Sequence, residues 1–407
     1  MAMIKKPVNG MKDILPGEMA VRNYVTELIR RTYSAFGFSS IDTPVVEHIE
    51  NLLSKQGGEN EKLIFKVLKR GEKLDLTKPT TEDAVTDSGL RYDLTLPLSR
   101  YYANHANELP SPFKALQIGS VFRADRPQRG RYRQFTQCDI DILGDPGYLA
   151  EIELILATTT VLGKLDFHNF TIRINDRRIL KAMAKKAGFP EEAYDRVFII
   201  LDKMDKIGMD GVRSELLASF PEETVDAYLG QFASGTELTP EQEALMEETG
   251  SPLRAIMDCV EAAKTADFRI VFDPTLVRGM SYYTGPIFEI AMDEYGGSVG
   301  GGGRYDEMIG KFTGQPTPAV GFSIGFERII LLLMERGFTV PGAQEKTAFL
   351  VEKNMPKEKL AEIFKEAVAL RAEGRTVDVS VMKKNKKFQK QQLTDEGYTE
   401  IREYFSR

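Results

Sequence analysis

The sequence predicts an α+β protein, in which a β-rich core is interrupted by helices and followed by a small α/β unit. Strand-like segments occur before residue 171 and again after residue 263. Between them, residues 172–262 contain segments such as YDRVFIILDKMDKIG, which have the apolar spacing of helices. After a stretch at 336–346 that contains Gly and Pro, short apolar runs alternate with a helical pattern. These observations define the fold class.

Chain length is consistent with this division, because 407 residues accommodate about two to three domains. We expect a core built from residues 1–171 and 263–336, with a helical insertion at 172–262. A small α/β domain is expected at 346–407.

Local patterns predict the elements of the first half. Residues 17–36 form an amphipathic helix, since their apolar side chains fall on one stripe. The β-branched stretch that follows contains Pro44, which cannot donate to a central ladder, so we expect a strand at an edge or with a bulge. Strands are predicted at 61–68 and 114–121, and a helix from about Leu94.

In the second half, strands are predicted at 269–273, 287–292 and 320–323, and a helix from about Phe326. The C-terminal part is predicted as strand–helix–strand–helix, from TAFLVE to KKFQKQQLTDEG.

Composition excludes several function classes. A net charge of −6, with 42% hydrophobic and 28% charged residues, is ordinary for a soluble globular protein. No apolar run approaches the roughly eighteen residues of a membrane span, and MAMIKKPVNG lacks the apolar core of a signal peptide. Two cysteines cannot form a disulfide framework, which fits a reducing cytoplasm. From these three observations together we expect a cytoplasmic protein without membrane contact. Three histidines without paired spacing disfavour a histidine-held metal or a Ser–His triad.

The strongest signal for a functional site is FRADRPQRGRYRQ at 122–134, which carries five arginines. In an acidic chain, so local a cationic cluster indicates an anion site. The segment after it alternates, so Gln137, Asp139 and Asp141 share one face of a predicted strand. Such a face beside the arginines could bind a zwitterion and a polyphosphate. The alternative is a solvated strand with surface ion pairs.

Three further segments carry polar groups that could act in a site. LVRGMSYYTGPIFE places Arg278 and two tyrosines just before a strand; on an extended backbone at most one tyrosine would face a given pocket. GGSVGGGGRYDEMIG has no P-loop spacing, and a glycine-rich hairpin is an equal alternative. In AVGFSIGFER, small residues alternate with apolar ones before Arg328, which favours a flat platform for a purine.

Together these segments resemble a known family. IDTPVVE, FRADRPQRGRYRQF and GFSIGFER resemble motifs one, two and three of the class II aminoacyl-tRNA synthetases. LVRGMSYYTG and GGGRYD resemble the two signature motifs of histidyl-tRNA synthetases, and the resemblance runs from about Gly10 to Leu333. It implies a catalytic core built on an antiparallel sheet flanked by helices. It also implies a homodimer, in agreement with the edge strand around Pro44.

The resemblance assigns roles to individual residues. It implies that Arg123 and Arg278 are catalytic, because they neutralise the α-phosphate of ATP. The residues expected to bind histidine are Asp93, Thr95, Gln137, Asp141, Tyr282, Tyr283 and Tyr305. Those expected to bind ATP are Arg123, Asp125, Arg131, Arg133, Glu327 and Arg328. Gln128 and Arg129 are expected to meet the tRNA acceptor end. Mg²⁺ is expected to bridge the phosphates; its ligands are unknown, with Glu327 as a candidate.

The implied reaction joins L-histidine to ATP, giving histidyl-adenylate and pyrophosphate, and then transfers histidine to the 3′ end of histidine tRNA. The nucleophile is the carboxylate of the substrate, so alignment and charge neutralisation suffice and no activated serine or general base is needed.

Alternatives remain for individual residues. Asp93 could cap the helix that follows it, and Tyr305 could be a core tyrosine with a satisfied hydroxyl. The KKNKK segment at 383–387 is either a solvated turn or a nucleic-acid contact. Asp139 has no role in this scheme.

The sequence departs from the family pattern at three places. Asp125 and Ser281 stand where Glu and Asp are usual, and the C-terminal part is shorter than the family's anticodon-binding domain, so we expect an abbreviated one. Ser281 and the short C-terminal part favour a rival interpretation. The rival is a paralogue that regulates ATP phosphoribosyltransferase in histidine biosynthesis and charges no tRNA. Retention of Arg278 and of GRYRQF favours the enzyme.

Overall fold

A computed structural model describes residues 3–53, 60–74, 76–77, 81–232, 239–277, 282–342 and 345–406. The chain divides into two compact units, Met1–Phe338 and Thr339–Arg407.

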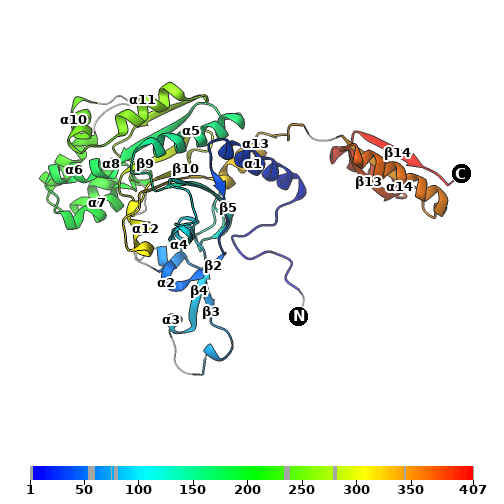
Figure 1. Ribbon diagram of the computed structural model, residues 1–407, viewed down its shortest axis with the longest axis horizontal. Helices are drawn as coiled ribbons and strands as arrows, with labels where there is room; N and C mark the ends of the chain where they lie inside the picture. The colour runs from blue at the N-terminus through cyan, green and yellow to red at the C-terminus, as the bar shows by residue number, and fades with distance from the viewer. Residues whose placement is uncertain are drawn as a thin grey trace. The chain divides into compact units, whose positions relative to one another are not determined.

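The first unit is built on an eight-stranded sheet (Figure 1). In spatial order its strands are β1 (Ser39–Ser40), β5 (Phe113–Phe122), β6 (Gln134–Leu143), β11 (Ala319–Ile324), β10 (Gly297–Arg304), β9 (Pro286–Met292), β7 (Phe170–Asp176) and β8 (Phe268–Phe272). Neighbouring strands are antiparallel except at the two ends of the sheet, where β1 pairs with β5 and β7 with β8 in parallel. The expected antiparallel core is therefore confirmed, and its central strands come from both halves of the sequence.

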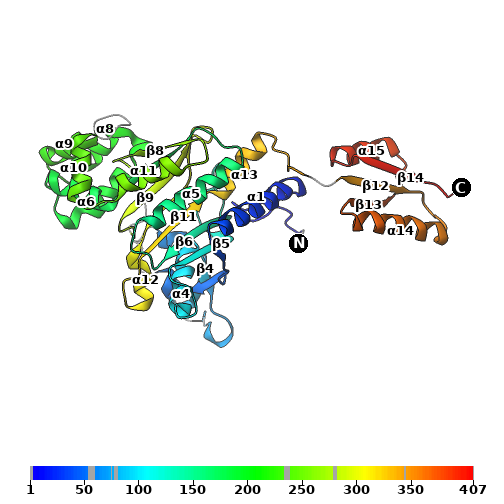
Figure 2. The same ribbon diagram turned by 45° about the horizontal axis from the view of Figure 1, so that its top comes forward.

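Helices lie on both sides of this sheet (Figures 1 and 2). On one side are α1 (Pro16–Ala35), α5 (Leu149–Lys164), α11 (Leu253–Ala263) and α13 (Phe326–Glu335). On the other are α4 (Thr95–His105) and α12 (Asp306–Thr313), which pack against each other. The predicted amphipathic helix is confirmed as α1, whose apolar stripe buries Val21, Val25 and Ile29 against the core.

A second, three-stranded antiparallel sheet has the order β2 (Val46–His48), β4 (Thr86–Leu90) and β3 (Lys66–Leu68). The segments around it are α2 (Ile49–Leu52), η1 (Asn60–Leu63), η2 (Gly71–Lys73) and α3 (Glu82–Val85). The stretch predicted as one strand around Pro44 is broken there, since Pro44 lies between β1 and β2 and in neither strand. Both β1 and β2 are edge strands, of two different sheets. The strand predicted at 61–68 is wrong in its first half, which forms the 3₁₀ turn η1.

Six helices are described between β7 and the return of the chain to the sheet as β8, in residues 177–232 and 239–263. They are α6 (Arg177–Ala187), α7 (Tyr194–Leu201), α8 (Met204–Leu217), α9 (Glu222–Leu229), α10 (Pro240–Glu248) and α11, with the turns η3 (Glu191–Ala193) and η4 (Gly230–Phe232). Asp176 caps α6 by accepting from the N–H of Arg178, and Gly188 ends the helix with a φ of 94°. Residues 172–176 of the expected insertion thus belong to the core strand β7.

The second unit is a small parallel sheet with two helices. Its elements are β12 (Lys346–Val351), α14 (Lys357–Ala372), β13 (Thr376–Val381), α15 (Lys386–Asp395) and β14 (Glu400–Tyr404). The strand order is β13-β12-β14, with Phe349 and Ala367 in its core. The predicted strand–helix–strand–helix pattern is confirmed, but β14 was missed. Its sequence, EIREY, is half-buried throughout and lacks a strand's apolar alternation.

Candidate functional site

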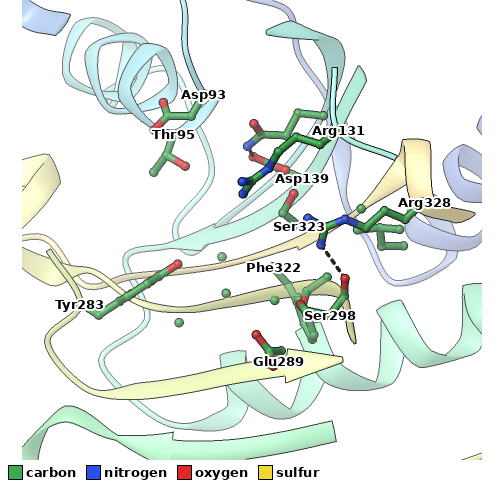
Figure 3. A pocket seen from close by; sticks show the side chains of 18 of the residues that line it. Asp93, Thr95, Arg131, Asp139, Tyr283, Glu289, Ser298, Phe322, Ser323 and Arg328 are labelled. Carbon is green, nitrogen blue, oxygen red and sulfur yellow. Dashed lines mark hydrogen bonds between the residues drawn. The ribbon is translucent and has the colours of Figure 1, made fainter. Parts of the chain in front are cut away.

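A cavity of about 510 Å³ lies over the central strands of the large sheet. Its floor comes from β6, β10 and β11, and its walls come from the loops before α4, after β5 and before β9. Figure 3 shows Asp93, Tyr283, Arg131 and Arg328 reaching it from different elements. Most of the residues expected to bind histidine or ATP meet here.

Strand β6 supplies the acidic side of the cavity. Gln137, Asp139 and Asp141 line it together, as the alternation predicted, while Cys138 and Ile140 are buried on the other face. Opposite Asp141, the partner residue on β11 is Gly321. A Cβ added at Gly321 would lie 2.0 Å from Asp141 Oδ1. The glycine therefore leaves the space that the carboxylate occupies.

Four buried oxygen atoms in this region have no hydrogen-bond partner. They are Asp93 Oδ2, Gln137 Oε1, Asp139 Oδ1 and Asp141 Oδ2. All are acceptors, and unsatisfied acceptors that are buried cost free energy. A ligand that brings several donors and positive charge would satisfy them.

Burial also raises the pKa of these carboxyl groups. Desolvation is the main cause at Asp93, although the N–H of Leu96 and the charge of Arg123 oppose it. Desolvation raises the pKa of Asp139 to about 7, and raises the pKa of Asp141 well above its usual range. The negative charge of Asp139 raises the pKa of Asp141 further. A cationic ligand would favour the ionised forms.

Asp93 and Thr95 reach the cavity from the start of α4. Asp93 Oδ1 accepts from the backbone N–H of Leu96 over 3.0 Å, so the helix-capping alternative is correct for this oxygen. Asp93 Oδ2 has no partner, and Asp93 lines the cavity, as Thr95 does. One carboxylate can therefore hold the helix and face a ligand.

Three of the tyrosines that line the same cavity are those expected to bind histidine, and Tyr132 lines it as well. The Tyr305 hydroxyl donates to Asp141 Oδ1 over 2.6 Å. The Tyr305 ring packs in an apolar cluster, so this residue is also a core tyrosine with a satisfied hydroxyl, as the alternative interpretation predicted. Tyr282 and Tyr283 both line the cavity, with ring centroids 4.7 Å apart. The expectation that only one would do so is wrong, because residues 282–285 are not extended as a strand.

The arginine cluster divides among several contacts. Arg123 lines the cavity, donates through Nε to the carbonyl of Tyr92 over 2.9 Å, and stacks on the Tyr92 and Phe135 rings. Arg131 also lines the cavity, with Nε 3.8 Å from Asp125 Oδ2. These two arginines are placed for an anion.

Arg328 approaches from α13. Its Nη1 donates to the carbonyl of Ser298 over 2.5 Å (Figure 3), and its guanidinium stacks on Tyr295. The Tyr295 hydroxyl in turn donates to the carbonyl of Arg129 over 3.0 Å. Tyr295 thus links the arginine-rich loop to Arg328. Sequence patterns missed it because it stands in a turn, outside every motif.

Other expected residues lie away from the cavity or have other partners. Arg133 does not line it, and donates to the carbonyls of Asp125 and Asn9. Gln128 and Arg129 are exposed on the loop, where Arg129 pairs with Glu335. Arg278 and Ser281 lie outside the described residues.

Glu327 lines the cavity, but its carboxylate is already bonded. Arg22 of α1 donates to both of its oxygens over 2.7 Å, and the N–H of Thr136 donates to Oε1 over 2.9 Å.

Within the described ranges, no group of three or more His, Cys, Asp or Glu side chains could hold a metal ion. In those ranges, no helix is long and apolar enough to span a membrane.

The helical segment also contributes to the wall. Asp202, Asp205 and Lys206 line the cavity from the α7–α8 region. Arg173 of β7 contacts Asp205, with Nη1 3.4 Å from its Oδ2, and also pairs with Glu289 of β9. Helical periodicity in the sequence predicts how these helices pack, but it does not predict the contact between Arg173 and Asp205.

The antiparallel sheet, the arginine-bearing loop after β5 and the arginine at the start of α13 define a class II aminoacyl-tRNA synthetase core. The sequence profile of histidyl-tRNA synthetase matches residues 10–329. The chain belongs to the histidyl-tRNA synthetase family.

Individual relatives agree. The chain is 47% identical over 350 residues to a histidine–tRNA ligase of Leifsonia xyli subsp. xyli, covering 80% of each. It is 37% identical over 374 residues to a histidine–tRNA ligase of Christiangramia forsetii, covering 86% of this chain and 81% of the relative. The crystal structure of histidyl-tRNA synthetase from Nostoc sp. PCC 7120 matches with a TM-score of 0.77 at 28% identity, over 97% of this chain and 90% of that one.

Proposed function

We infer that the protein is a histidine–tRNA ligase, an aminoacyl-tRNA synthetase that activates L-histidine with ATP and transfers it to histidine tRNA. The observation that carries this inference is the set of four buried, unpartnered acceptors beside cavity-lining arginines, in a chain of this family. The acceptors match a donor-rich amino acid, and the arginines match a phosphate.

We propose that histidine binds at the acidic side of the cavity. Asp93 and Gln137 would accept from the α-ammonium, with Thr95 assisting, and Asp141 and Tyr283 would bind the imidazole nitrogens. Tyr305 and Tyr282 would complete the pocket. The hydrogen bond from Tyr305 to Asp141 supports this assignment, because it holds one carboxylate oxygen and leaves the other for the ligand.

ATP would bind beside the arginines, over the glycine-rich strands β10 and β11. The carboxylate of histidine attacks the α-phosphate and pyrophosphate leaves. Arg123, with Arg278 as its expected partner, would stabilise the negative charge that develops there. Asp125, Arg131 and Arg328 would hold the remaining parts of ATP.

Magnesium would act as a partner of the ATP phosphates, neutralising their charge. Glu327 fits poorly as its ligand, since both of its oxygens already accept hydrogen bonds. Gln128 and Arg129, on an exposed loop, would meet the tRNA acceptor end. We also propose a homodimer through the region of β2.

The rival role, regulation of ATP phosphoribosyltransferase, has less support. A structure from Bacillus halodurans, titled ATP phosphoribosyltransferase regulatory subunit/histidyl-tRNA synthetase, matches with a TM-score of 0.76 at 20% identity, over 99% of each chain. Identity that low speaks for the fold alone. The relatives of higher identity carry the name of the ligase.

Histidine-dependent exchange between ATP and pyrophosphate tests the activation step. The purified chain should catalyse exchange with L-histidine and not with other amino acids. Absence of exchange at saturating histidine would rule out the ligase. Arg123→Ala and Arg278→Ala should each lower kcat by roughly 10²–10³-fold, as expected for loss of a group that binds the transition-state charge. Unchanged kcat in both variants would show that the α-phosphate site is elsewhere.

A further inference from the structure

We propose that Asp139 is a positioning residue that orients the side-chain amide of Gln137, so that the amide oxygen faces the ammonium group of the substrate. Asp139 has no role in the binding scheme above, although it lies in the same cavity. This inference rests on the proposed function, because the ammonium group is that of histidine.

The geometry is local to one strand. Gln137 and Asp139 are two residues apart on the inward face of β6, and the two residues are 8% and 4% exposed. Gln137 Nε2 donates to Asp139 Oδ2 over 2.6 Å. Gln137 Oε1 is buried without a partner. The NH₂ end of the amide is therefore held, and the oxygen end is available to a ligand.

Orientation matters because the two ends of an amide have opposite hydrogen-bonding roles. An ionised carboxylate only accepts hydrogen bonds, so above about pH 7, the raised pKa of Asp139, this side chain can hold the NH₂ end of Gln137 and not the oxygen end. A substrate ammonium only donates, so it needs the oxygen. If Gln137 were turned round, its NH₂ group would face the ammonium and binding would be lost. Asp139 would thus favour the binding orientation before histidine arrives.

Other groups also face this pair. Across the sheet, the partner of Asp139 is Ser323 on β11, whose side chain lines the cavity and interacts with the Asp139 carboxyl group, and the charges of Asp93 and Arg123 act on it as well. Asp139 Oδ1 has no partner of its own, so a direct contact with the substrate is the competing explanation. The two explanations differ in whether the effect of Asp139 requires Gln137.

Asp139→Asn is the first variant, because it keeps the shape of the side chain. An amide at this position can accept from Gln137 Nε2 or donate to Gln137 Oε1, so it no longer selects one orientation. In the exchange assay, the KM for histidine should rise about tenfold, while the KM for ATP stays within about twofold. Asp176→Asn is the matched control, since Asp176 is a buried carboxylate outside the cavity. In the Asp176→Asn variant the KM for histidine should not change. An unchanged KM in Asp139→Asn overturns the inference.

A double-mutant cycle separates positioning from direct contact. In a Gln137→Ala background, Asp139→Asn should change the KM for histidine by less than about twofold, because the group it positions is gone. Additive effects would mean that Asp139 acts on the substrate independently, and would overturn the inference.

Exchanging the amide and the carboxylate between positions 137 and 139 gives a further test. This test does not depend on whether the Asp139→Asn variant folds well. In the double variant Gln137→Glu/Asp139→Asn, the amide donates and the carboxylate accepts, which leaves one carboxylate oxygen for the ligand. The KM for histidine should return to within about threefold of wild type. A double variant that folds, by thermal melting, yet binds histidine no better than Asp139→Asn contradicts the inference.

Calorimetry identifies the substrate group involved. Asp139→Asn should bind L-histidine more weakly, yet bind imidazolepropionate, which lacks the ammonium, as wild type does. Equal loss for both ligands would overturn the inference. Failure of the wild type to catalyse exchange would sink the proposed function instead, so the two failures are distinguishable.

Discussion

At the scale of single residues, the cavity carries groups that are unfavourable until a ligand binds. Asp93, Asp139 and Asp141 are each at most 4% exposed, and each has one oxygen without a partner. Protein stability alone would favour apolar side chains at such positions. Their presence makes sense if histidine supplies the missing donors.

The free energy of unfolding should depend on pH, because burying an ionised carboxylate without partners is unfavourable. Burial raises the pKa of Asp139 to about 7 in the folded chain, against about 3.9 in the unfolded chain. The folded state therefore binds more protons between these values, and the free energy of unfolding falls as pH rises from about 4 to about 7. Asp139→Asn removes the titrating group, so this fall in the free energy of unfolding should be absent from the variant. Without ligand, its melting temperature should exceed that of wild type at pH 8, and the difference should disappear near pH 4. Parallel pH profiles would show that Asp139 is not a buried, titrating group.

Gly321 should tolerate no side chain. A Cβ there would lie 2.0 Å from Asp141 Oδ1, so Gly321→Ala must displace that carboxylate. We expect the KM for histidine to rise by about tenfold or more, because a displaced carboxylate leaves the ligand's donor unpaired. Gly17→Ala is the control, since a Cβ at Gly17 would meet no atom within 4 Å. Similar kinetics in the two variants would remove Asp141 from the histidine site.

At the scale of elements, the ion pair between Arg22 and Glu327 connects α1, α13 and β6. Each residue is 8% exposed, and Glu327 also accepts from the backbone of Thr136. The pair thus fixes the start of α13, next to Arg328. Glu327 thus acts as structural support for the side of the cavity where we propose that ATP binds.

Arg22→Ala should therefore destabilise the protein by about 3–5 kcal/mol, because it leaves a buried carboxylate without its counter-ion. Urea denaturation measures the change in the free energy of unfolding. Arg31→Ala on the same helix breaks an exposed pair with Glu27 and should cost at most about 1 kcal/mol. Equal losses in the two variants would show that burial of the Arg22 pair has no energetic consequence.

At the scale of the whole molecule, every described residue that lines the cavity belongs to the first unit. A chain that ends at Phe338 should therefore retain histidine-dependent exchange within about threefold, because it keeps the site and its own core. Charging of histidine tRNA should fall much further if the second unit contacts the tRNA. Comparing exchange with tRNA charging in the two chains tests this, and a collapse of exchange in a folded truncation would contradict it.

Much of the architecture was predictable because it depends on local patterns. The alternation after the arginine cluster correctly placed Gln137, Asp139 and Asp141 on one face, and the strand–helix pattern of the second unit was correct except for β14. Predictions failed where local rules did not apply. Tyr282 and Tyr283 were assumed to be extended, but they lie in a turn, where neighbours can face the same cavity.

Sequence patterns were enough to predict the family, several of the core strands and most of the residues that line the cavity, because motifs and periodicity are properties of short segments. How those side chains pair with one another depends on the tertiary structure. Glu327 binds Arg22, 305 positions away, and Tyr295 joins the arginine loop to Arg328. Periodicity tells which face of its own element a side chain occupies, but not which distant element lies opposite. The unpartnered oxygens of Asp93, Asp139 and Asp141 became visible only once these elements were packed together.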